Sequence, residues 1–242
     1  MLNKTKKNIK KFLLTKLLNG TNVQCNICNK GFSTYLSYLD RLNAKCPNCE
    51  SIERTRLVWH FITDKKLIGA DAIVLHVAPE KALFDKLKNA TKRYLPIDKF
   101  EEGYSYPSIT KEMDVTDLKL ENEQVDGIIC MHVLEHVLED RKALSEFYRV
   151  LKPGGWAIIQ VPFEEDREVT YEDPSILSKA ERKAHFGQTD HVRVYGTDYL
   201  KRFVEPGFVI EELNYEKSIS DEIKFKLQLK KENIFLMRKP KA

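Results

Sequence analysis

The sequence predicts an α/β fold, with a mostly parallel sheet preceded by a small cysteine-rich module. The first observation is one strand–helix–strand unit. An apolar strand, Val125 to Met131, is followed by a turn, an amphipathic helix, the segment Lys152 to Gly155 and a second apolar strand, Trp156 to Val161. Right-handed crossovers make such strands parallel in one sheet. The second observation is a pair of Cys-x-x-Cys motifs near the N-terminus.

Length and composition limit the class of protein. The chain has 242 residues, of which 42% are hydrophobic, enough for one large domain or one domain with a small module. No apolar run approaches the roughly 18 to 20 residues of a membrane span. Lysines interrupt the apolar residues at the N-terminus, which argues against a signal peptide. We therefore expect a cytoplasmic protein whose five cysteines are thiols or metal ligands.

Charge is concentrated at the N-terminus. The net charge is +4, and six lysines lie within the first sixteen residues. The rest of the chain has 34 basic and 36 acidic side chains. Enzymes of nucleic acids usually present a broad basic face, so this distribution disfavours a nucleic-acid partner.

Residues 1–18 are predicted to form a basic amphipathic helix. Ile9, Phe12, Leu13 and Leu17 recur at helical spacing, and lysines cover the other side. Such an apolar stripe usually docks a helix on the protein body. A weak contact with an anionic membrane surface and a frayed tail are the alternatives.

Residues 20–50 contain Cys25, Cys28, Cys46 and Cys49, with seventeen residues between the two pairs. Each pair turns two thiolates toward one point, and two pairs make the closed tetrahedral site that structural zinc prefers. Four unligated thiols would leave this segment, which is rich in Asn and Lys, without a core. The spacing therefore predicts a structural zinc site with no open coordination position.

A helix is predicted from Ser51, as its N-terminal cap, to about Ile62. Glu53, Arg54 and Arg56 lie on its first turns. These charges could meet an acidic substrate, but such side chains are more often solvated or paired with one another.

The rest of the chain alternates strands and helices. Further strands are predicted at Ala72 to Val77, Arg93 to Ile97, Phe208 to Leu213 and Asn233 to Met237, and helices follow Ala78-Pro79 to about Lys88 and near Asp198 to Val204. We divide the chain into residues 1–66, with the basic helix, cysteine module and second helix, and residues 67–242. A long polar insertion covers about residues 163–196 of the second part.

Three motifs resemble class I S-adenosyl-L-methionine (SAM)-dependent methyltransferases. Asp126 opens a strand, Leu134-Glu135-His136 follows it, and Leu151 to Gly155 leads into the next strand. The resemblance covers about residues 70–240. It implies a seven-stranded, mostly parallel Rossmann-like sheet that ends in an antiparallel hairpin, with SAM as cofactor.

The cofactor is expected beyond the carboxyl ends of the strands that begin near residues 72, 93 and 125. Asp98 follows Ala78 by twenty residues and lies at a strand end, which suits a ligand of ribose hydroxyls. A plain strand-end turn residue is the alternative. The resemblance also implies contacts of Asp114 with the adenine amine, of Val115 with the ring, and of Met131 and His132 with the pocket.

The loop after the first of these strands departs from the family's Gly-x-Gly pattern. It consists of His76, Val77, Ala78, Pro79 and Glu80. Glycines permit positive φ and a close approach of backbone to ligand. Either another turn holds the methionine part through backbone carbonyls and Glu80, or the site has lost its cofactor. The loop resembles those of bacterial methyltransferase-like proteins with a cysteine module in front, which favours the first explanation. A dinucleotide enzyme is disfavoured, since its pyrophosphate needs a glycine-rich turn.

Methyl transfer to a hydroxyl requires a base close to the acceptor. Histidine is the usual one, and four histidines fall in suitable places: His132, His136, His185 and His191. We favour His191, oriented by Asp190 or Asp173, and then His136, for which packing at a helix start is the alternative. The insertion that carries His191 is either a functional loop or a solvated one.

The leading hypothesis is a SAM-dependent enzyme that methylates a polar small molecule or saccharide, at oxygen. A methyltransferase acting on RNA or protein through the zinc module is the second, although the near-neutral body argues against RNA. The third is a non-catalytic, zinc-containing binding protein on a degenerate methyltransferase fold, which the missing glycines motivate.

Overall fold

The computed structural model describes residues 2–102, 104–212 and 214–241. Met1 and Leu213, each at the end of a predicted element, lie outside the described residues. The chain divides into two compact units: unit 1 comprises Met1–Ile68, Glu80–Ala90 and Asn214–Asn233, and unit 2 comprises Gly69–Pro79, Thr91–Leu213 and Ile234–Ala242. Within the described part, no helix has the length and apolar character needed to cross a membrane.

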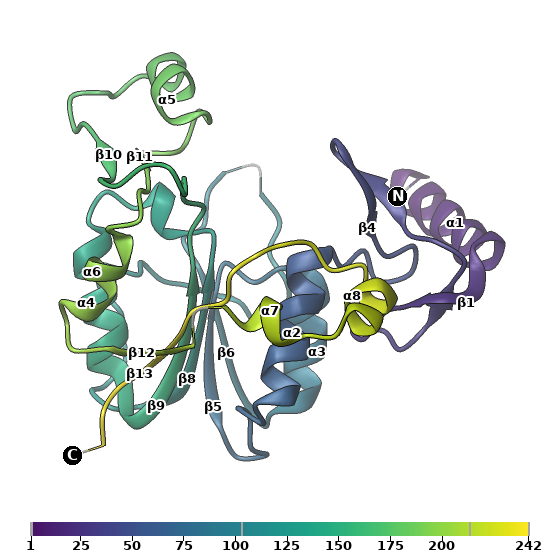
Figure 1. The fold of residues 1–242 in the computed structure, drawn as a ribbon, viewed down its shortest axis with the longest axis horizontal. Helices are drawn as coiled ribbons and strands as arrows, with labels where there is room; N and C mark the ends of the chain where they lie inside the picture. Colours follow the sequence, from purple (N-terminus) through teal and green to yellow (C-terminus); the bar gives the residue numbers. More distant parts are fainter. Residues whose placement is uncertain (1, 103, 213, 242) are drawn as a thin grey trace. The chain divides into compact units, whose positions relative to one another are not determined.

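Unit 2 is built on a seven-stranded sheet of order β12-β13-β9-β8-β5-β6-β7 (Figure 1). The strands are β5 (Ile73–Val77), β6 (Arg93–Asp98), β7 (Lys111–Glu112), β8 (Val125–Met131), β9 (Leu151–Gln160), β12 (Val209–Glu212) and β13 (Leu236–Arg238). β7, β6, β5, β8 and β9 are parallel, and β13 pairs antiparallel with both β9 and β12. The predicted sheet with its antiparallel ending is confirmed.

The remaining elements of unit 2 follow the strands. They are the 3-10 helix η1 (Leu134–His136), α4 (Asp140–Val150), β10 (Tyr171–Glu172), α5 (Lys179–Phe186), β11 (Arg193–Val194) and α6 (Tyr199–Val204). β10 and β11 pair antiparallel inside the insertion. α5 begins with a capping box between Ser178 and Glu181 and ends at Gly187, whose φ is +84°. The insertion is therefore a structured element and not a plain loop.

The segment Lys152 to Gly155, expected to precede the strand that starts at Trp156, belongs to β9, which already begins at Leu151. Val125 pairs with Leu151, and the next pair is Gly127 with Trp156, so four residues of β9 bulge out of register. Gly154 has a φ of +76° in this bulge. Gly127 is required by packing, since a Cβ there would lie 2.2 Å from the Trp156 ring.

Unit 1 contains the cysteine module and several helices. Its elements are α1 (Leu2–Leu17), β1 (Asn19–Gln24), β2 (Gly31–Phe32), β3 (Leu36–Tyr38), β4 (Arg41–Lys45), α2 (Glu53–Asp64), α3 (Lys81–Ala90), α7 (Tyr215–Ser218) and α8 (Asp221–Leu227). β1 pairs with β2 and β3 with β4, both antiparallel. The sequence did not indicate that residues 214–233, near the end of the chain, form α7 and α8 and belong to this unit.

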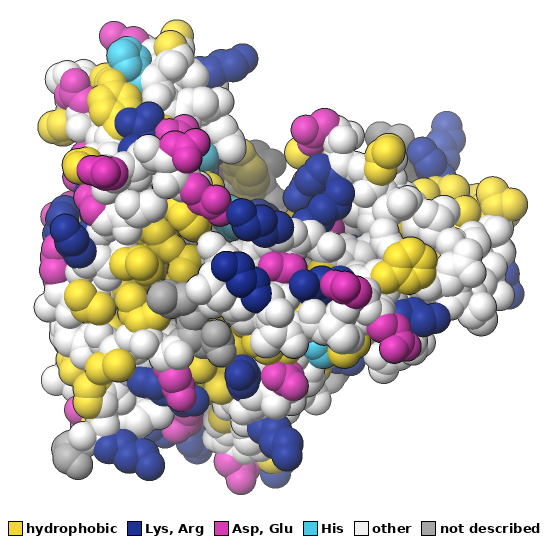
Figure 2. Space-filling view, viewed as in Figure 1, with side chains coloured by type: hydrophobic (Ala, Val, Ile, Leu, Met, Phe, Trp, Pro, Cys, Tyr) yellow, Lys and Arg dark blue, Asp and Glu magenta, His cyan; other side chains and the backbone are white. Residues whose placement is uncertain are grey.

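The predicted docking of the N-terminal helix is wrong. Ile9, Phe12, Leu13 and Leu17, the residues of the apolar stripe, are 55%, 61%, 59% and 78% exposed. Figure 2 shows hydrophobic side chains on the surface of α1, at the right of the view. The helix itself is confirmed, but its apolar face is open to solvent.

Candidate functional site

The carboxyl ends of the parallel strands form one edge in unit 2. Val77 of β5 pairs with Ile97 of β6 on one side and with Cys130 of β8 on the other. Ala78, Asp98 and Met131, each one residue further on, therefore lie in a row across three neighbouring strands. β5 is central in this row, where the connections of an open sheet diverge and ligands bind.

Two backbone positions at this edge are left-handed although neither residue is glycine. Ala78 has a φ of +47° and His132 a φ of +53°. Hydrogen bonds to the neighbouring strands hold both: the Ala78 amide donates to the Ile97 carbonyl and the His132 amide to the Gln160 carbonyl, each at 2.9 Å. Alanine thus adopts the backbone conformation for which the family pattern uses glycine, and such strain is typical of functional sites.

His76 and Glu80, the ends of the predicted cofactor loop, have side chains that bind other residues of the protein. The His76 ring is fully buried and its Nδ1 lies 2.7 Å from the Tyr94 hydroxyl, while burial lowers the pKa of His76 to about 3. The Glu80 carboxylate accepts hydrogen bonds from Arg54 and Thr55 of α2 in unit 1. The structure therefore offers Val77, Ala78 and Pro79 as the loop residues of the unit 2 edge.

Asp98 and Asp114 keep carboxylates at the same edge. Burial raises the pKa of Asp98, and a hydrogen bond from the Lys99 backbone opposes that rise. The Asp114 carboxylate accepts bonds from the amide and the hydroxyl of Thr116, both at 2.8 Å, which lower its pKa. Its second oxygen lies 3.4 Å from Lys99. Asp98 remains suited to ribose hydroxyls and Asp114 to an adenine amine.

The apolar residues predicted for the pocket are largely covered. Val115 is 7% exposed and Met131 is 6% exposed. Val115 belongs to the hydrophobic core of unit 2, and Met131 is the last residue of β8. A ligand at the edge would meet only a small part of either side chain.

Glu135, His136 and His191 form a second group close to this edge. One ligand atom from each lies within 4.8 Å of the others. The His136 and His191 rings meet edge-on with centroids 4.8 Å apart. His132, at the carboxyl end of β8, lies 3.4 Å from the Glu135 carboxylate and connects the group to the predicted cofactor edge. The sequence singled out His136 and His191 but missed Glu135.

Two interactions bring His191 to η1 across 55 residues of chain. The Val192 amide donates to the Glu135 carbonyl at 2.9 Å. The buried Arg193 side chain donates to the carbonyls of Leu134, Val137 and Leu138, on both sides of Glu135 and His136. The insertion is thus fixed to the turn after β8.

An ionic network, buried at Asp140, Arg193 and Arg202, supports this attachment. Asp140 accepts from Tyr195 and Arg202, and Glu172 accepts from Arg193 and Arg202, with distances of 2.8 Å. Burial alone would raise the pKa of Glu172, but hydrogen bonds from Arg202 and then Arg193 outweigh it and hold the pKa at about 2. No local motif in the sequence indicated this network, because its members are scattered from residue 140 to residue 202.

The other predicted acid–base partners take separate positions. His185 is exposed and bonds to the Tyr171 hydroxyl, and Asp173 accepts from Ser175. Asp190 lies 3.3 Å from the His136 ring. Burial lowers the pKa of His191, and the neighbouring His136 lowers it further, so its imidazole is neutral near pH 7.

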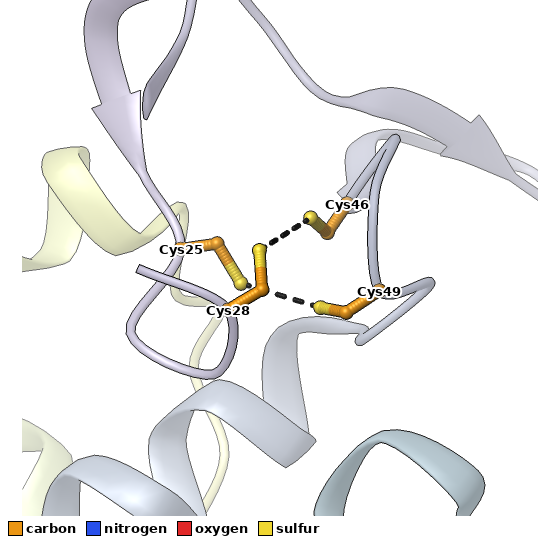
Figure 3. Close-up of side chains that lie close together, drawn as sticks. All are labelled: Cys25, Cys28, Cys46 and Cys49. Carbon is orange, nitrogen blue, oxygen red and sulfur yellow. Dashed lines mark hydrogen bonds between the residues drawn. The ribbon is translucent and has the colours of Figure 1, made fainter. Parts of the chain in front are cut away.

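The four cysteines of unit 1 converge on one point, as Figure 3 shows. The Cys25 and Cys49 sulfurs lie 3.5 Å apart and the Cys28 and Cys46 sulfurs 3.7 Å apart. Sulfurs around a tetrahedral zinc, at a zinc–sulfur distance of about 2.3 Å, lie about 3.8 Å apart. The residues present therefore fit a zinc ion.

The two Cys-x-x-Cys loops share one backbone design. The amides of Asn29 and Glu50 donate back to the carbonyls of Cys25 and Cys46, at 2.7 and 3.1 Å. Both residues are left-handed, with φ of +57° and +64°. Each loop thus turns its two sulfurs to the same side, which explains why the local spacing alone predicted the cluster.

Ser51 and Arg56 support the cluster, and their predicted roles are wrong. Ser51 does not cap α2, which begins at Glu53 without a side-chain cap; its hydroxyl lies 3.3 Å from the Cys25 sulfur and 3.2 Å from that of Cys49. Arg56 is fully buried, stacks on Tyr35 and donates to main-chain carbonyls that include that of Ser51. It therefore cannot meet a substrate, and its buried charge suits four thiolates nearby.

A cavity of about 940 Å³ lies in unit 1 beside the cysteine module. Its basic lining residues are Lys11, Lys45, Arg54, Lys81 and Lys86. Three of these pair with acids of the same lining, as Arg54 with Glu80, Lys81 with Asp85 and Lys45 with Glu50. Arg54 thus pairs with Glu80, a residue outside α2.

Comparison with known proteins agrees with the fold of the sheet. Residues 73–159 match the family described as Methyltransferase domain. The chain is 28% identical over 161 residues to the S-adenosyl-L-methionine-dependent Diels-Alderase iccD of Talaromyces variabilis, covering 65% of this chain and 49% of that protein. It thus spans about half the length of that curated relative.

Two solved structures share the fold at low sequence identity. The [4+2]-cyclase SpnF aligns with a TM-score of 0.54 and 15% identity, covering 78% of this chain and 82% of that chain. The 1,6-didemethyltoxoflavin-N1-methyltransferase of Burkholderia thailandensis, with bound 1,6-didemethyltoxoflavin and S-adenosylhomocysteine (SAH), aligns with a TM-score of 0.51 and 15% identity, covering 77% and 78%.

The sheet order of unit 2 is that of a class I SAM-dependent methyltransferase fold. Residues 73–159 match a methyltransferase domain, and a four-cysteine module precedes them in the chain.

Proposed function

We propose that the protein transfers the methyl group of SAM to a hydroxyl of a polar small molecule or a saccharide. The observation that carries this proposal is the position of the Glu135–His136–His191 cluster. His132 links it, at 3.4 Å from Glu135, to the edge where the cofactor is expected. Polar groups able to activate an acceptor thus lie next to the expected methyl donor.

SAM supplies a methyl group on a sulfonium, which an acceptor oxygen can displace. The residues that would hold it are Val77, Ala78 and Pro79 in the loop, Asp98 at the ribose, Asp114 and Val115 at the adenine, and Met131 and His132 from β8. The left-handed Ala78 supports this assignment, since it turns the loop without glycine. Asp98 supports it because its half-buried carboxylate lies at the end of β6, one residue beyond the last pair of β5 with β6.

The acceptor hydroxyl must lose its proton as the new bond forms. Imidazoles suit this step in two ways, either as proton acceptors or as ligands of a cation that acidifies the hydroxyl. His191 and His136 are therefore the residues assigned to acceptor activation. The polar, charged insertion around them supports a hydrophilic acceptor.

The reaction can be tested by incubating the protein with SAM and a set of polyols and sugars, followed by mass spectrometry. We expect SAH in equal amount to a product heavier by one methylene. A product with the mass of its substrate would instead indicate a cyclisation, as the names of iccD and SpnF suggest for those proteins. Absence of both products in a sample that binds SAH would contradict transfer to this acceptor class.

We further propose that zinc is structural and bound by Cys25, Cys28, Cys46 and Cys49. Four protein thiolates close a tetrahedral site, so no position remains for a substrate. The support of Ser51 and Arg56 from within the same unit agrees with a role in folding.

For α1 we propose a weak contact with an anionic membrane surface. Exposed apolar residues and lysines on one helix are the features that bind lipid headgroups and acyl chains together. Co-sedimentation with anionic vesicles should fall in a Phe12→Ser variant. Leu39→Ser, which removes a residue 82% exposed outside the helix, is the matched control. Equal sedimentation of all three proteins would contradict the contact.

A further inference from the structure

The Glu135 carboxylate is buried without full compensation. The residue is 2% exposed, and within the described part of the chain its Oε2 has no hydrogen-bond partner. A buried carboxylate oxygen that lacks a partner is costly. His132 lies 3.4 Å from the other oxygen, Oε1. Oε2 therefore remains available to bind a ligand from outside the protein.

Two imidazoles face the same point from different segments. His136 follows Glu135 in η1, and His191 comes from the insertion, with one ligand atom of each residue within 4.8 Å of the others. Ligand atoms bound to a divalent cation at about 2.1 Å are at most about 4.2 Å apart. The His136 ring is exposed, so its rotation would shorten this separation.

Neighbouring groups orient both rings. Asp190 lies 3.3 Å from Nδ1 of His136, which leaves Nε2 of that ring for another partner. The His191 ring hydrogen-bonds to the main chain of Phe186. Metal-binding histidines usually use their second nitrogen in this way, with a carboxylate or a backbone carbonyl.

We propose that Glu135, His136 and His191 bind a divalent transition-metal ion. Two imidazoles and one carboxylate are a common ligand set for such ions, and three protein ligands leave coordination positions open. This site is distinct from the four-cysteine cluster of unit 1 in its ligands and in its open positions.

Resting on the proposed methyl transfer, the open positions would take two neighbouring oxygens of a hydroxylated acceptor. The acceptor hydroxyl, acidified by the cation, loses its proton to solvent. Its oxygen then attacks the methyl carbon as the carbon–sulfur bond breaks and the electron pair stays on sulfur. His136 and His191 act as ligands in this scheme and not as bases.

The metal site can be tested by titrating the full-length, zinc-loaded protein with Mn²⁺ and following the electron paramagnetic resonance signal of the free ion. Mn²⁺ prefers carboxylate and imidazole ligands and leaves the thiolate site to zinc. We expect one bound Mn²⁺ for each chain. Glu135→Gln and His136→Asn should each weaken binding by about 10- to 100-fold or more.

Two exposed neighbours of the same residue types serve as controls. Glu139→Gln and His185→Asn should leave Mn²⁺ affinity unchanged. The proposal is overturned if the wild type binds no Mn²⁺, or if Glu135→Gln and His136→Asn, shown to be folded by their zinc content and thermal unfolding, bind it as the wild type does.

Titration of the same samples with SAH separates this proposal from the proposed function. Mn²⁺ binding that depends on Glu135 in a protein without SAH affinity supports the metal site while the methyl transfer fails. SAH binding with no Mn²⁺ binding overturns the metal site and leaves the methyl transfer standing.

Discussion

The four-cysteine cluster of unit 1 and the Glu135–His136–His191 cluster of unit 2 differ in how completely they surround their centre. The cysteines come from two equivalent loops and offer four sulfurs, which fills a tetrahedral site. The second cluster offers three ligand atoms and includes an imidazole that is 34% exposed. A closed cluster suits folding and an open one suits chemistry on a substrate.

The largest effect is expected from opening the closed cluster. Cys46→Ser removes one of four thiolates, and structural zinc contributes about 10–16 kcal/mol to folding in isolated zinc-finger peptides. We expect loss of zinc by elemental analysis and a lower unfolding temperature. Cys130→Ala, at a buried cysteine of β8 outside the cluster, should keep the zinc. One zinc retained by Cys46→Ser would refute the four-cysteine site.

Chelation should distinguish the two clusters directly. Brief treatment with EDTA is expected to strip Mn²⁺ from the open cluster, because its ion exchanges through free coordination positions, while zinc stays on the cysteines. Elemental analysis after desalting measures both metals in one sample. Loss of both metals at the same rate would contradict the closed and open assignments.

Lowering the pH should weaken the ionic network that fixes the insertion beside the open cluster. The folded-state pKa of Glu172 is about 2 against an ordinary 4.5, so its stabilisation is present above pH 4.5 and is lost as pH falls toward 2. The difference in Tm between wild type and Glu172→Gln should therefore be constant near neutrality and shrink across this window. Glu168→Gln, at an exposed position of the insertion, should differ little from wild type at any pH. A difference that grows in acid would contradict the assignment.

The smallest effect concerns the cofactor loop. A left-handed conformation costs an L-residue about 1–2 kcal/mol. Glycine at this position avoids that cost, but it loses about 0.5–1 kcal/mol more conformational entropy on folding than alanine does. Ala78→Gly should raise stability by at most about 1 kcal/mol and preserve SAH binding. Ala143→Gly, in the middle of α4, should lower stability. Destabilisation by Ala78→Gly would show that the alanine side chain is needed there.

The sequence predicted features that depend on neighbouring residues. The four-cysteine cluster and the strand from Val125 to Met131 are both present as predicted, because each depends on short stretches of sequence. The bulge of β9 was missed, since it depends on the register with β8 and not on its Lys-Pro-Gly-Gly sequence alone.

The open cluster was predicted only in part, because its geometry is set over long distances in the chain. His136 and His191 were predicted as single residues. Glu135 becomes part of a site only because Val192 and Arg193 bind the insertion to η1, which brings His191 close to it. The position of Ser51 suggests a helix cap, but in the folded protein its hydroxyl contacts the sulfurs of Cys25 and Cys49 instead. Tertiary contacts decided both cases.

We propose that SAM binds at the edge formed by Ala78, Asp98 and Met131. The most direct measurement is a calorimetric titration of the zinc-loaded protein with SAH, alongside Asp98→Ala. We expect a saturable complex that the variant weakens by about 1–3 kcal/mol, the value of hydrogen bonds to a charged group. Equal affinity of the two proteins would contradict the ribose assignment. No binding to folded wild type would contradict the cofactor site and favour a non-catalytic binding protein.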